Sequence, residues 1–368
     1  MKSTEQFLNQ VQANLVEFCG KQRSDFEAIS GDLVPVVDFT QSLLEGGKRF
    51  RALFAYFAWL SSLKDQTIAD EQFEAITGIG AALEMFHAAA LVHDDLLDQS
   101  DTRRGAPAIH KRFEAMHKAK NWAGSPERFG VAGSVLVGDL MLGWSSEIFG
   151  HALLQSKDKE VESSCRDEFS LMRVEVMAGQ YLDVLEENAA ATRTISEAVG
   201  RAEKVILYKT AKYSIEAPLR LGGAFAGADQ SDLGVYTQIG IPLGIAFQLR
   251  DDILGVYGDP SVTGKPAGDD LREGKRTVLV ALTKEALAER SPSMVDTFEE
   301  LLTSRELDEN QISFLQKLIK DSGALDKTER MIVELGDRSL AALDAAELNE
   351  IGKQGLKALA LRVMNRDS

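Results

Sequence analysis

The chain has few of the residues that stabilise small extracellular domains or interrupt helices. Only two of its 368 residues are cysteine, and Cys19 and Cys165 lie far apart, without the spacing of a metal site or a C-x-x-C motif. Proline accounts for 8 residues and aromatic residues for 7% of the chain. These scarcities exclude a disulfide-rich scaffold, and we expect both cysteines to be reduced in a cytoplasmic protein.

Long apolar runs and excess positive charge are missing as well. The amino-terminal residues lack the apolar core of a signal peptide, and no run reaches the roughly 18 apolar residues of a membrane span. With 41 Lys and Arg against 57 Asp and Glu, the formal net charge is −16. Because phosphate backbones need clustered cations, this charge argues against a nucleic-acid partner. The sequence therefore predicts an acidic protein without stable membrane insertion.

Helical periodicity is abundant. Apolar residues recur at steps of three and four from the start, and few segments combine strict alternation with β-branched residues, so no sheet is expected. The ranges that we expect to be helical are 52–64, 71–97, 131–154, 166–190, 194–222, 230–257 and most of 276–364. We expect 99–130 and 258–276 to be irregular. Because charged motifs crowd both, they are interpreted as functional loops of one all-α domain spanning 1–368.

Three aspartates, Asp94, Asp95 and Asp98, stand at the end of the predicted 71–97 helix. Asp94 and Asp98 are four residues apart, so their carboxylates share one helix face and repel each other. The carboxyl end of a helix is also the negative end of its dipole. Such an arrangement favours a bound cation, and oxygen ligands suit Mg²⁺. A solvated acidic helix end explains the same residues, so this cluster alone leaves both interpretations open.

A second pair, Asp251 and Asp252, follows another long apolar stretch and favours the metal interpretation. Upstream, residues 46–51 read Gly-Gly-Lys-Arg-Phe-Arg and open a helix, where backbone amides together with Lys48 and Arg51 suit an anion. Further basic residues lie in the loops around both aspartate clusters, namely Arg103, Arg104, Lys265, Lys275 and Arg276. The acidic and basic sets together predict a metal-bridged diphosphate site.

These residues belong to a series of longer motifs. The motifs are GGKRFR at 46–51, ExxHxxxLVHDDLLD at 84–98, RRGAP at 103–107, GDLML at 138–142, AGQYLD at 178–183, KTAKYS at 209–214, FQLRDDILGVYGD at 247–259 and GKPAGDDLREGKRT at 264–277. In content, order and spacing the series resembles the trans-isoprenyl diphosphate synthases, or polyprenyl synthetases, and among them the geranylgeranyl diphosphate synthases. The resemblance implies a type I isoprenoid synthase fold, a bundle of about ten or more helices around a large central cavity.

The resemblance also implies a reaction. Isopentenyl diphosphate is condensed with an allylic diphosphate (dimethylallyl, geranyl or farnesyl), whose own diphosphate leaves once metal and basic side chains neutralise its charge. The double bond of isopentenyl diphosphate then attacks the allylic carbocation, a proton is lost, and a buried cavity excludes water. About three Mg²⁺ ions and a homodimer are implied as well.

The resemblance assigns roles residue by residue. The metal ligands are Asp94, Asp98 and Asp251, supported by Asp95 and Asp252; the allylic diphosphate ligands are Arg103, Lys209 and Lys265; and the isopentenyl diphosphate ligands are Lys48, Arg51, His87 and Arg104. Thr210 and Gln248 would point dipoles at the carbocation, whereas Asp139 and Asp183 are interpreted as structural. The second motif departs from the usual D-D-x-x-D pattern because Gly255 stands at its last position. This departure puts one supporting carboxylate in doubt.

Product length in this family depends on the residues that precede the first aspartates. Ala89 and Ala90 are small where farnesyl-producing relatives place aromatic rings, whereas Met85 and Phe86 lie one turn further down. Eight residues of helix rise about 12 Å, a depth that suits an intermediate product. We therefore expect geranylgeranyl diphosphate, with a longer polyprenyl or a farnesyl product as the alternative. A class I terpene cyclase and an inactive partner subunit are weaker alternatives, because the chain has both aspartate pairs and the basic set.

Overall fold

The fold is described from a computed structural model, which describes residues 2–64, 68–154, 156, 158–258, 267–304 and 306–364. Lys265, predicted as a diphosphate ligand, lies outside the described residues. The helices are α1 Thr4–Ile29, α2 Val34–Leu43, α3 Phe50–Ser62, α4 Asp70–Leu97, α5 Ile109–Ala119, α6 Pro126–Leu153, α7 Lys159–Ala189, α8 Ala198–Val205, α9 Ala217–Phe225, α10 Gln230–Tyr257, α12 Asp269–Arg272, α13 Val278–Arg290, α14 Ser293–Thr303, α15 Glu309–Ser322, α16 Ala324–Ala345 and α17 Glu350–Met364. Shorter elements are the 3-10 helices η1 Gly31–Leu33, η2 Ala190–Thr192 and η3 Ile195–Glu197, the π-helix η4 Ile206–Glu216, and the strands β1 Thr102–Arg103 and β2 Ala106–Pro107.

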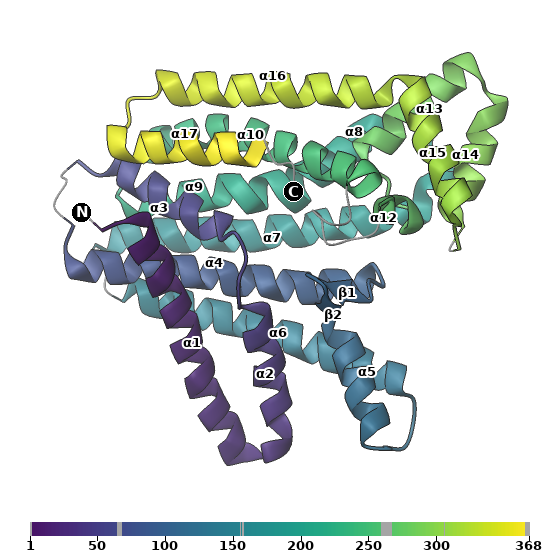
Figure 1. Ribbon diagram of the computed structural model, residues 1–368. Coiled ribbons are helices and arrows are strands. Elements are labelled where there is room, and N and C mark those ends of the chain that lie inside the picture. Colours follow the sequence, from purple (N-terminus) through teal and green to yellow (C-terminus); the bar gives the residue numbers. More distant parts are fainter. Residues whose placement is uncertain are drawn as a thin grey trace.

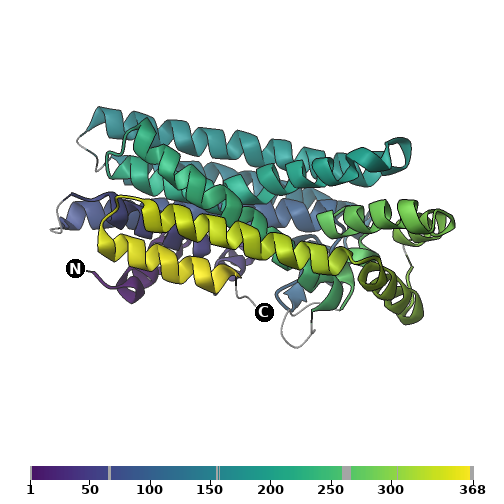
Figure 2. The same cartoon turned by 90° about the horizontal axis from the view of Figure 1, so that it is seen from above.

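The long helices α4, α6, α7, α10 and α16 run roughly alongside one another, while α1 and α2 cross them on one side (Figure 1). α4 is apolar on nearly all sides because α1, α3 and α6 pack around it. Viewed from above, α16 and α17 cover α10 (Figure 2). The helical bundle predicted from the sequence is therefore confirmed, and the predicted 230–257 helix has the bounds of α10.

Two hydrophobic clusters fill the bundle, and α10 runs through both. Leu233 and Tyr236, near its beginning, belong to the large cluster that also contains α3, α4, α6 and α7. Leu249 and Ile253, near its end, belong to a smaller cluster formed with α13 to α16. The acidic end of α10 therefore emerges from a rigidly packed helix, which fixes the position of the aspartates there.

The prediction that 99–130 is irregular was wrong for two stretches. Residues 102–107 form a short antiparallel hairpin, β1–β2, and Ile109–Ala119 forms α5. Ile109, Phe113 and His117 recur at steps of four and are buried, which gives α5 one apolar face. α6 already begins at Pro126, where Ser125 caps the helix by accepting from the Arg128 amide. Helix α2 was also missed.

The predicted 194–222 helix is helical along most of its length but changes type in the middle, where η4 is a π-helix. Glycines of two neighbouring helices contact the η4 backbone directly. A Cβ at Gly179 of α7 would lie 2.7 Å from Lys209 Cα, and a Cβ at Gly244 of α10 would lie 2.5 Å from Ala211 Cα. Because both neighbours can approach so closely, η4 is held between α7 and α10. π-helical turns are often found at functional sites.

Two helices are long and apolar enough to cross a membrane by length and composition alone, α4 and α6. In α4, 78% of the most apolar window is buried inside the protein, as expected of a core helix. In α6 the buried share is only 39%. The outer face of α6 is therefore an apolar surface that the rest of the described chain leaves uncovered.

Candidate functional site

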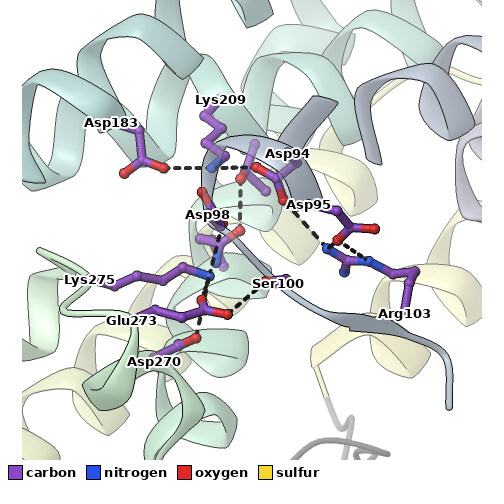
Figure 3. Close-up of polar contacts among 12 residues, drawn as sticks. Asp94, Asp95, Asp98, Ser100, Arg103, Asp183, Lys209, Asp270, Glu273 and Lys275 are labelled. Atoms are coloured by element: carbon purple, nitrogen blue, oxygen red, sulfur yellow. Dashed lines mark hydrogen bonds and ion pairs between the residues drawn. The ribbon is translucent and has the colours of Figure 1, made fainter. Parts of the chain in front are cut away.

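Asp94, Asp95 and Asp98 lie at the carboxyl end of α4, as predicted, and we call these three residues the first wall. Lys209 of η4 places its Nζ 3.0 Å from Asp94 Oδ1. Arg103 of β1 donates from Nε to Asp95 Oδ1 at 2.7 Å. Cations from two other elements thus offset the repulsion and the unfavourable helix-dipole position that the sequence indicated (Figure 3).

Two carboxyl groups of the first wall differ in acidity. Burial alone would raise the pKa of Asp94, but Lys209 and Lys275 hold it below its usual value. Burial, and then the charge of Asp94, raise the pKa of Asp98 to about 6. Lys275 Nζ lies 3.5 Å from Asp98 Oδ2, too far to reverse this effect. The ion pair with Lys275 therefore offsets the burial of Asp98 only in part.

Asp251 and Asp252, which we call the second wall, lie near the end of α10. Asp251 is half-buried and Asp252 is buried. Gln248 donates from Nε2 to Asp252 Oδ1 at 2.9 Å, while Asp252 Oδ2 is buried with no hydrogen-bond partner among the described residues. Burial is the main reason why the pKa of Asp252 is raised well above its usual value. A buried carboxylate oxygen with no protein donor is suited to bind a cation.

The turn after α12 connects the two walls. Lys275 Nζ lies 3.5 Å from Asp98 Oδ2, 3.5 Å from Asp270 Oδ1 and 2.7 Å from Glu273 Oε2. Ser100, just after the first wall, donates to Glu273 Oε1 at 2.8 Å. Figure 3 shows Lys275, Glu273 and Asp270 gathered beside Asp98. Residues almost two hundred positions apart in the chain thus form one charged site.

The π-helix η4 contributes to both walls through neighbouring residues. Lys209 reaches the first wall, and its Nζ also lies 2.5 Å from Asp183 Oδ2 of α7. Thr210 donates from Oγ1 to Gln248 Oε1 of α10 at 2.7 Å. Because Gln248 in turn donates to Asp252, a chain of hydrogen bonds runs from η4 to the second wall. Asp183, interpreted from the sequence as structural, thus pairs with a predicted diphosphate ligand.

A cluster of cationic side chains, formed by Arg51, Arg104 and Lys48, lies beside the first wall. Arg51 donates to Ser214 Oγ at 2.7 Å and stacks on the Tyr213 ring at 4.5 Å, while its Nε is buried with no hydrogen-bond partner among the described residues. Arg104 is brought against the Gly46–Gly47 turn, since a Cβ at Gly47 would lie 3.3 Å from Arg104 Nη2. Lys48 is exposed in the same turn. An unpaired, buried guanidinium N–H beside other cations suits an anion.

His87 lies beside this cationic cluster and not in a purely apolar core. Its Nδ1 is 3.1 Å from Tyr213 Oη. Burial, followed by the positive charges of four arginines, lowers its pKa well below the usual value, so the imidazole is neutral. The four are Arg51, Arg104, Arg103 and Arg49. Four guanidinium groups around one uncharged histidine again indicate a binding site for a polyanion.

The Gly46–Arg51 segment differs from the prediction in one respect. Arg49, with φ 51°, pairs with Glu84 of α4 at 3.2 Å. Glu84 also accepts from the Ala52 amide at 3.3 Å, in the first turn of α3. One of the backbone amides expected to bind an anion is therefore occupied by a carboxylate of the protein itself.

The residues predicted to set product length are buried beneath the first wall. Met85 and Ala89 are fully buried, Ala90 is half-buried, and Phe86 is 1% exposed. The Phe86 ring lies 5.7 Å from the Tyr213 ring of η4 and 6.4 Å from the Phe169 ring of α7, measured between centroids. Phe86 thus packs against the two elements that carry Lys209 and Asp183, and not against the outer helices.

The candidate site offers carboxylate oxygens to a metal ion but does not form a complete cage for one. No group of three or more His, Cys, Asp or Glu side chains in the described residues is close enough together to hold an ion on its own. Mg²⁺ does not require such a cage, because it retains waters and is commonly bound by one or two carboxylates together with substrate phosphates. The orphaned oxygen of Asp252 and the carboxylates of the first wall are donors of the right kind. The residues therefore fit Mg²⁺ that arrives with a phosphate ligand.

Comparison with known proteins gives matches over most of the chain. The family model described as Polyprenyl synthetase matches residues 36–319. The crystal structure of geranylgeranyl pyrophosphate synthase from Corynebacterium glutamicum, complexed with isoprenyl diphosphate and magnesium, is 37% identical, with a TM-score of 0.91 over 99% of this chain and 100% of that one. This match confirms the predicted all-α fold class.

Curated relatives are similar over somewhat shorter stretches. The geranylgeranyl diphosphate synthase of Sulfolobus acidocaldarius is 31% identical over 272 residues, 73% of this chain and 72% of the relative. The geranylfarnesyl diphosphate synthase of Aeropyrum pernix is 30% identical over 306 residues, 82% of this chain and 85% of the relative. The two relatives thus differ in the product for which they are named, at nearly the same identity.

Proposed function

The chain belongs to the polyprenyl synthetase family and is a trans-prenyltransferase, and on that premise we propose that it extends allylic diphosphates with isopentenyl diphosphate to geranylgeranyl diphosphate, using Mg²⁺. The observation that carries the proposal is the adjacency of two anion-binding regions. One lies between the two walls, with Lys209 and Lys275, and the other contains Arg51, His87 and Arg104. A condensation of two diphosphates needs both.

The residues of the chain divide the chemistry between them. When bound, Mg²⁺ would neutralise the charge that the allylic diphosphate gains as it leaves. Lys209 and Arg103, already beside the first wall, are positioned to contact the same diphosphate. The hydroxyl hydrogen of Thr210 is held by Gln248, which leaves the lone pairs of Thr210 Oγ1 available to the developing cation. The arginines around His87 would hold isopentenyl diphosphate through its charge.

The decisive test is an incorporation assay. Purified protein, Mg²⁺ and labelled isopentenyl diphosphate are combined with dimethylallyl, geranyl or farnesyl diphosphate, and the dephosphorylated products are separated by chromatography. We expect incorporation with a twenty-carbon product. Cyclic hydrocarbon from a single allylic substrate would indicate a terpene cyclase instead, and no incorporation with any primer would favour an inactive partner subunit.

Product length is proposed to depend on Phe86. Its ring is buried one turn of α4 before Ala89 and Ala90 and is backed by Phe169, whose ring stacks on Phe149 at 4.0 Å between centroids. Phe86→Ala removes the floor, so products longer than twenty carbons are expected in the chromatogram. Phe298→Ala, a fully buried ring of α14 in the other cluster, is the matched control and should leave product length unchanged. Unchanged length in Phe86→Ala would show that this ring is not the floor.

A homodimer is proposed through the outer faces of α6 and α7. Large apolar side chains are exposed there, namely Val131, Val135 and Leu136 on α6 and Leu171, Val174, Met177 and Tyr181 on α7. The two helices touch where Phe149 stacks on Phe169, so their exposed residues belong to neighbouring elements. Exposed apolar surface of this kind commonly forms a subunit interface. Sedimentation of Val174→Asp should show monomer where the unaltered chain shows dimer, whereas Val333→Asp, exposed on α16, should remain dimeric.

A further inference from the structure

Gly255 stands where the second wall lacks a carboxylate. It follows Asp251 by four residues and Asp252 by three in the continuous helix α10. Positions at this spacing share one helix face. A side chain at position 255 would therefore extend the face that carries both aspartates, and the glycine leaves space there.

That space is filled by another part of the chain. A Cβ built on Gly255 would collide with the carboxylate of Asp270, lying 2.9 Å from Oδ1 and closer still to Oδ2 and Cγ. Asp270 belongs to the short helix α12, which begins after Gly268, a residue with φ 76°. The collision involves the charged end of the side chain, so the carboxylate itself occupies the position beside α10.

The surroundings of Asp270 are those of the site. Its Oδ1 lies 3.5 Å from Lys275 Nζ, and the same ammonium lies 3.5 Å from Asp98 Oδ2 of the first wall. The negative charge of Asp270 helps to raise the pKa of Asp252. The Oδ2 atom of Asp252 is buried with no hydrogen-bond partner in the described part of the chain. Asp270 therefore lies beside Lys275 and Glu273, close to Asp98 of the first wall (Figure 3), with its side chain 14% exposed.

We propose that Asp270 replaces the missing third carboxylate of the second wall, and that Gly255 is required because Asp270 occupies its side-chain space. The inference rests on the proposed function, since the carboxylate is expected to support Mg²⁺ brought in with a diphosphate. Position 255 and position 270 are then alternatives, because a carboxylate fits at either one but not at both.

The test uses the full chain in five forms besides the unaltered one. Asp270→Asn removes the charge and keeps the shape. Gly255→Ala adds only the colliding methyl group, and Gly255→Asp adds a carboxylate beside the existing one. The double variant Gly255→Asp with Asp270→Ala moves the carboxylate from α12 to α10. Asp296→Asn, an exposed aspartate of α14, is the control for loss of one negative charge.

The main readout is calorimetric binding of inorganic diphosphate at increasing Mg²⁺, with Tm in the absence of Mg²⁺ as the second. Asp270→Asn should weaken Mg²⁺-dependent binding by about 10- to 100-fold, as loss of a supporting carboxylate commonly does. Gly255→Ala and Gly255→Asp should weaken Mg²⁺-dependent binding as Asp270→Asn does, and lower Tm only slightly, because the new side chain displaces the carboxylate of Asp270 from its position. The double variant should bind within about 3-fold of the unaltered chain, a strongly non-additive result. Asp296→Asn should change neither.

Two results would overturn the proposal. One is Mg²⁺-dependent binding by Asp270→Asn equal to that of the unaltered chain, with only Tm lowered, since Asp270 would then be a mere partner of Lys275. The other is a double variant that binds no better than Asp270→Asn. Failure of the proposed function is distinguishable, because the unaltered chain itself would then incorporate no isopentenyl diphosphate.

Discussion

The two walls of the site carry similar aspartates but differ in how the protein neutralises them. In the first wall, Lys209 and Arg103 contact Asp94 and Asp95 directly, and the neighbouring lysines hold the pKa of Asp94 below its usual value. In the second wall, Asp252 receives a hydrogen bond from the neutral Gln248, and burial favours its protonated form. The comparison teaches that repeated Asp-Asp motifs need not be equivalent. Asp94 of the first wall is paired with a cation, whereas Asp252 of the second wall is buried beside a neutral amide.

The largest effect is expected when the first wall is broken. Asp94→Asn should lower kcat/KM by about 10³, because it removes a predicted ligand of the Mg²⁺ that would neutralise the departing diphosphate and leaves Lys209 to pair with Asp183 alone. Asp252→Asn should lower it by only about 10-fold to 100-fold, the range for a supporting residue. Steady-state incorporation of isopentenyl diphosphate measures both. Equal losses in the two variants would contradict the distinction between the walls.

A pH titration of stability sharpens the comparison further. Because the pKa of Asp98 is raised to about 6, its stabilising contribution is complete below 3.8 and is lost as the pH rises through 6. Glu187 of α7, raised to about 7 mainly by burial, acts in the same direction. Tm without Mg²⁺ should therefore fall between pH 4.5 and 7.5, and fall less in Asp98→Asn. An equally steep fall in that variant would count against the assignment.

The smallest effect is expected at Ser100, whose hydroxyl group connects the first wall to the turn after α12. Ser100→Ala removes the hydrogen bond to Glu273 at 2.8 Å. A hydrogen bond to a charged group contributes about 1.5–3 kcal/mol, and since water can replace this half-buried hydroxyl, the loss should be nearer the lower value. We expect KM for the allylic substrate to rise a few-fold with kcat nearly unchanged. A kcat loss as large as that of Asp252→Asn would place Ser100 in the chemistry itself.

Much of this site was predictable because its residues lie in contiguous motifs. Asp94, Lys209 and Gln248 were assigned from the resemblance, and the structure brings all three into one network. Asp183 was interpreted as structural and Asp270 was not assigned, although both lie inside the recognised motifs. Their roles depend on pairing across helices, with Lys209 and with the space at Gly255, and no local pattern encodes such a pairing.

The fold was predictable in type but not in every detail. The apolar period of α10 gave its bounds, whereas α5 was obscured by the Arg, Lys, Gly and Pro residues around it. The π-helical character of η4 left no trace in the periodicity, because it arises from the close approach of α7 and α10 at Gly179 and Gly244. Such tertiary causes are invisible in a single segment.

Lys209 and Lys275 give the site a particular order of events. Their ammonium groups lie among the carboxylates as internal counter-ions. A metal ion that binds alone must compete with the lysines for the aspartates. A diphosphate that binds alone must compete with the aspartates for the lysines. When metal and diphosphate bind together, the ammonium groups of the lysines can pair with the phosphate oxygens instead. The aspartates are then available to the metal. By thermodynamic linkage, each ligand then raises the affinity of the other by the same factor. The resting enzyme thus discriminates against either ligand without its counterpart.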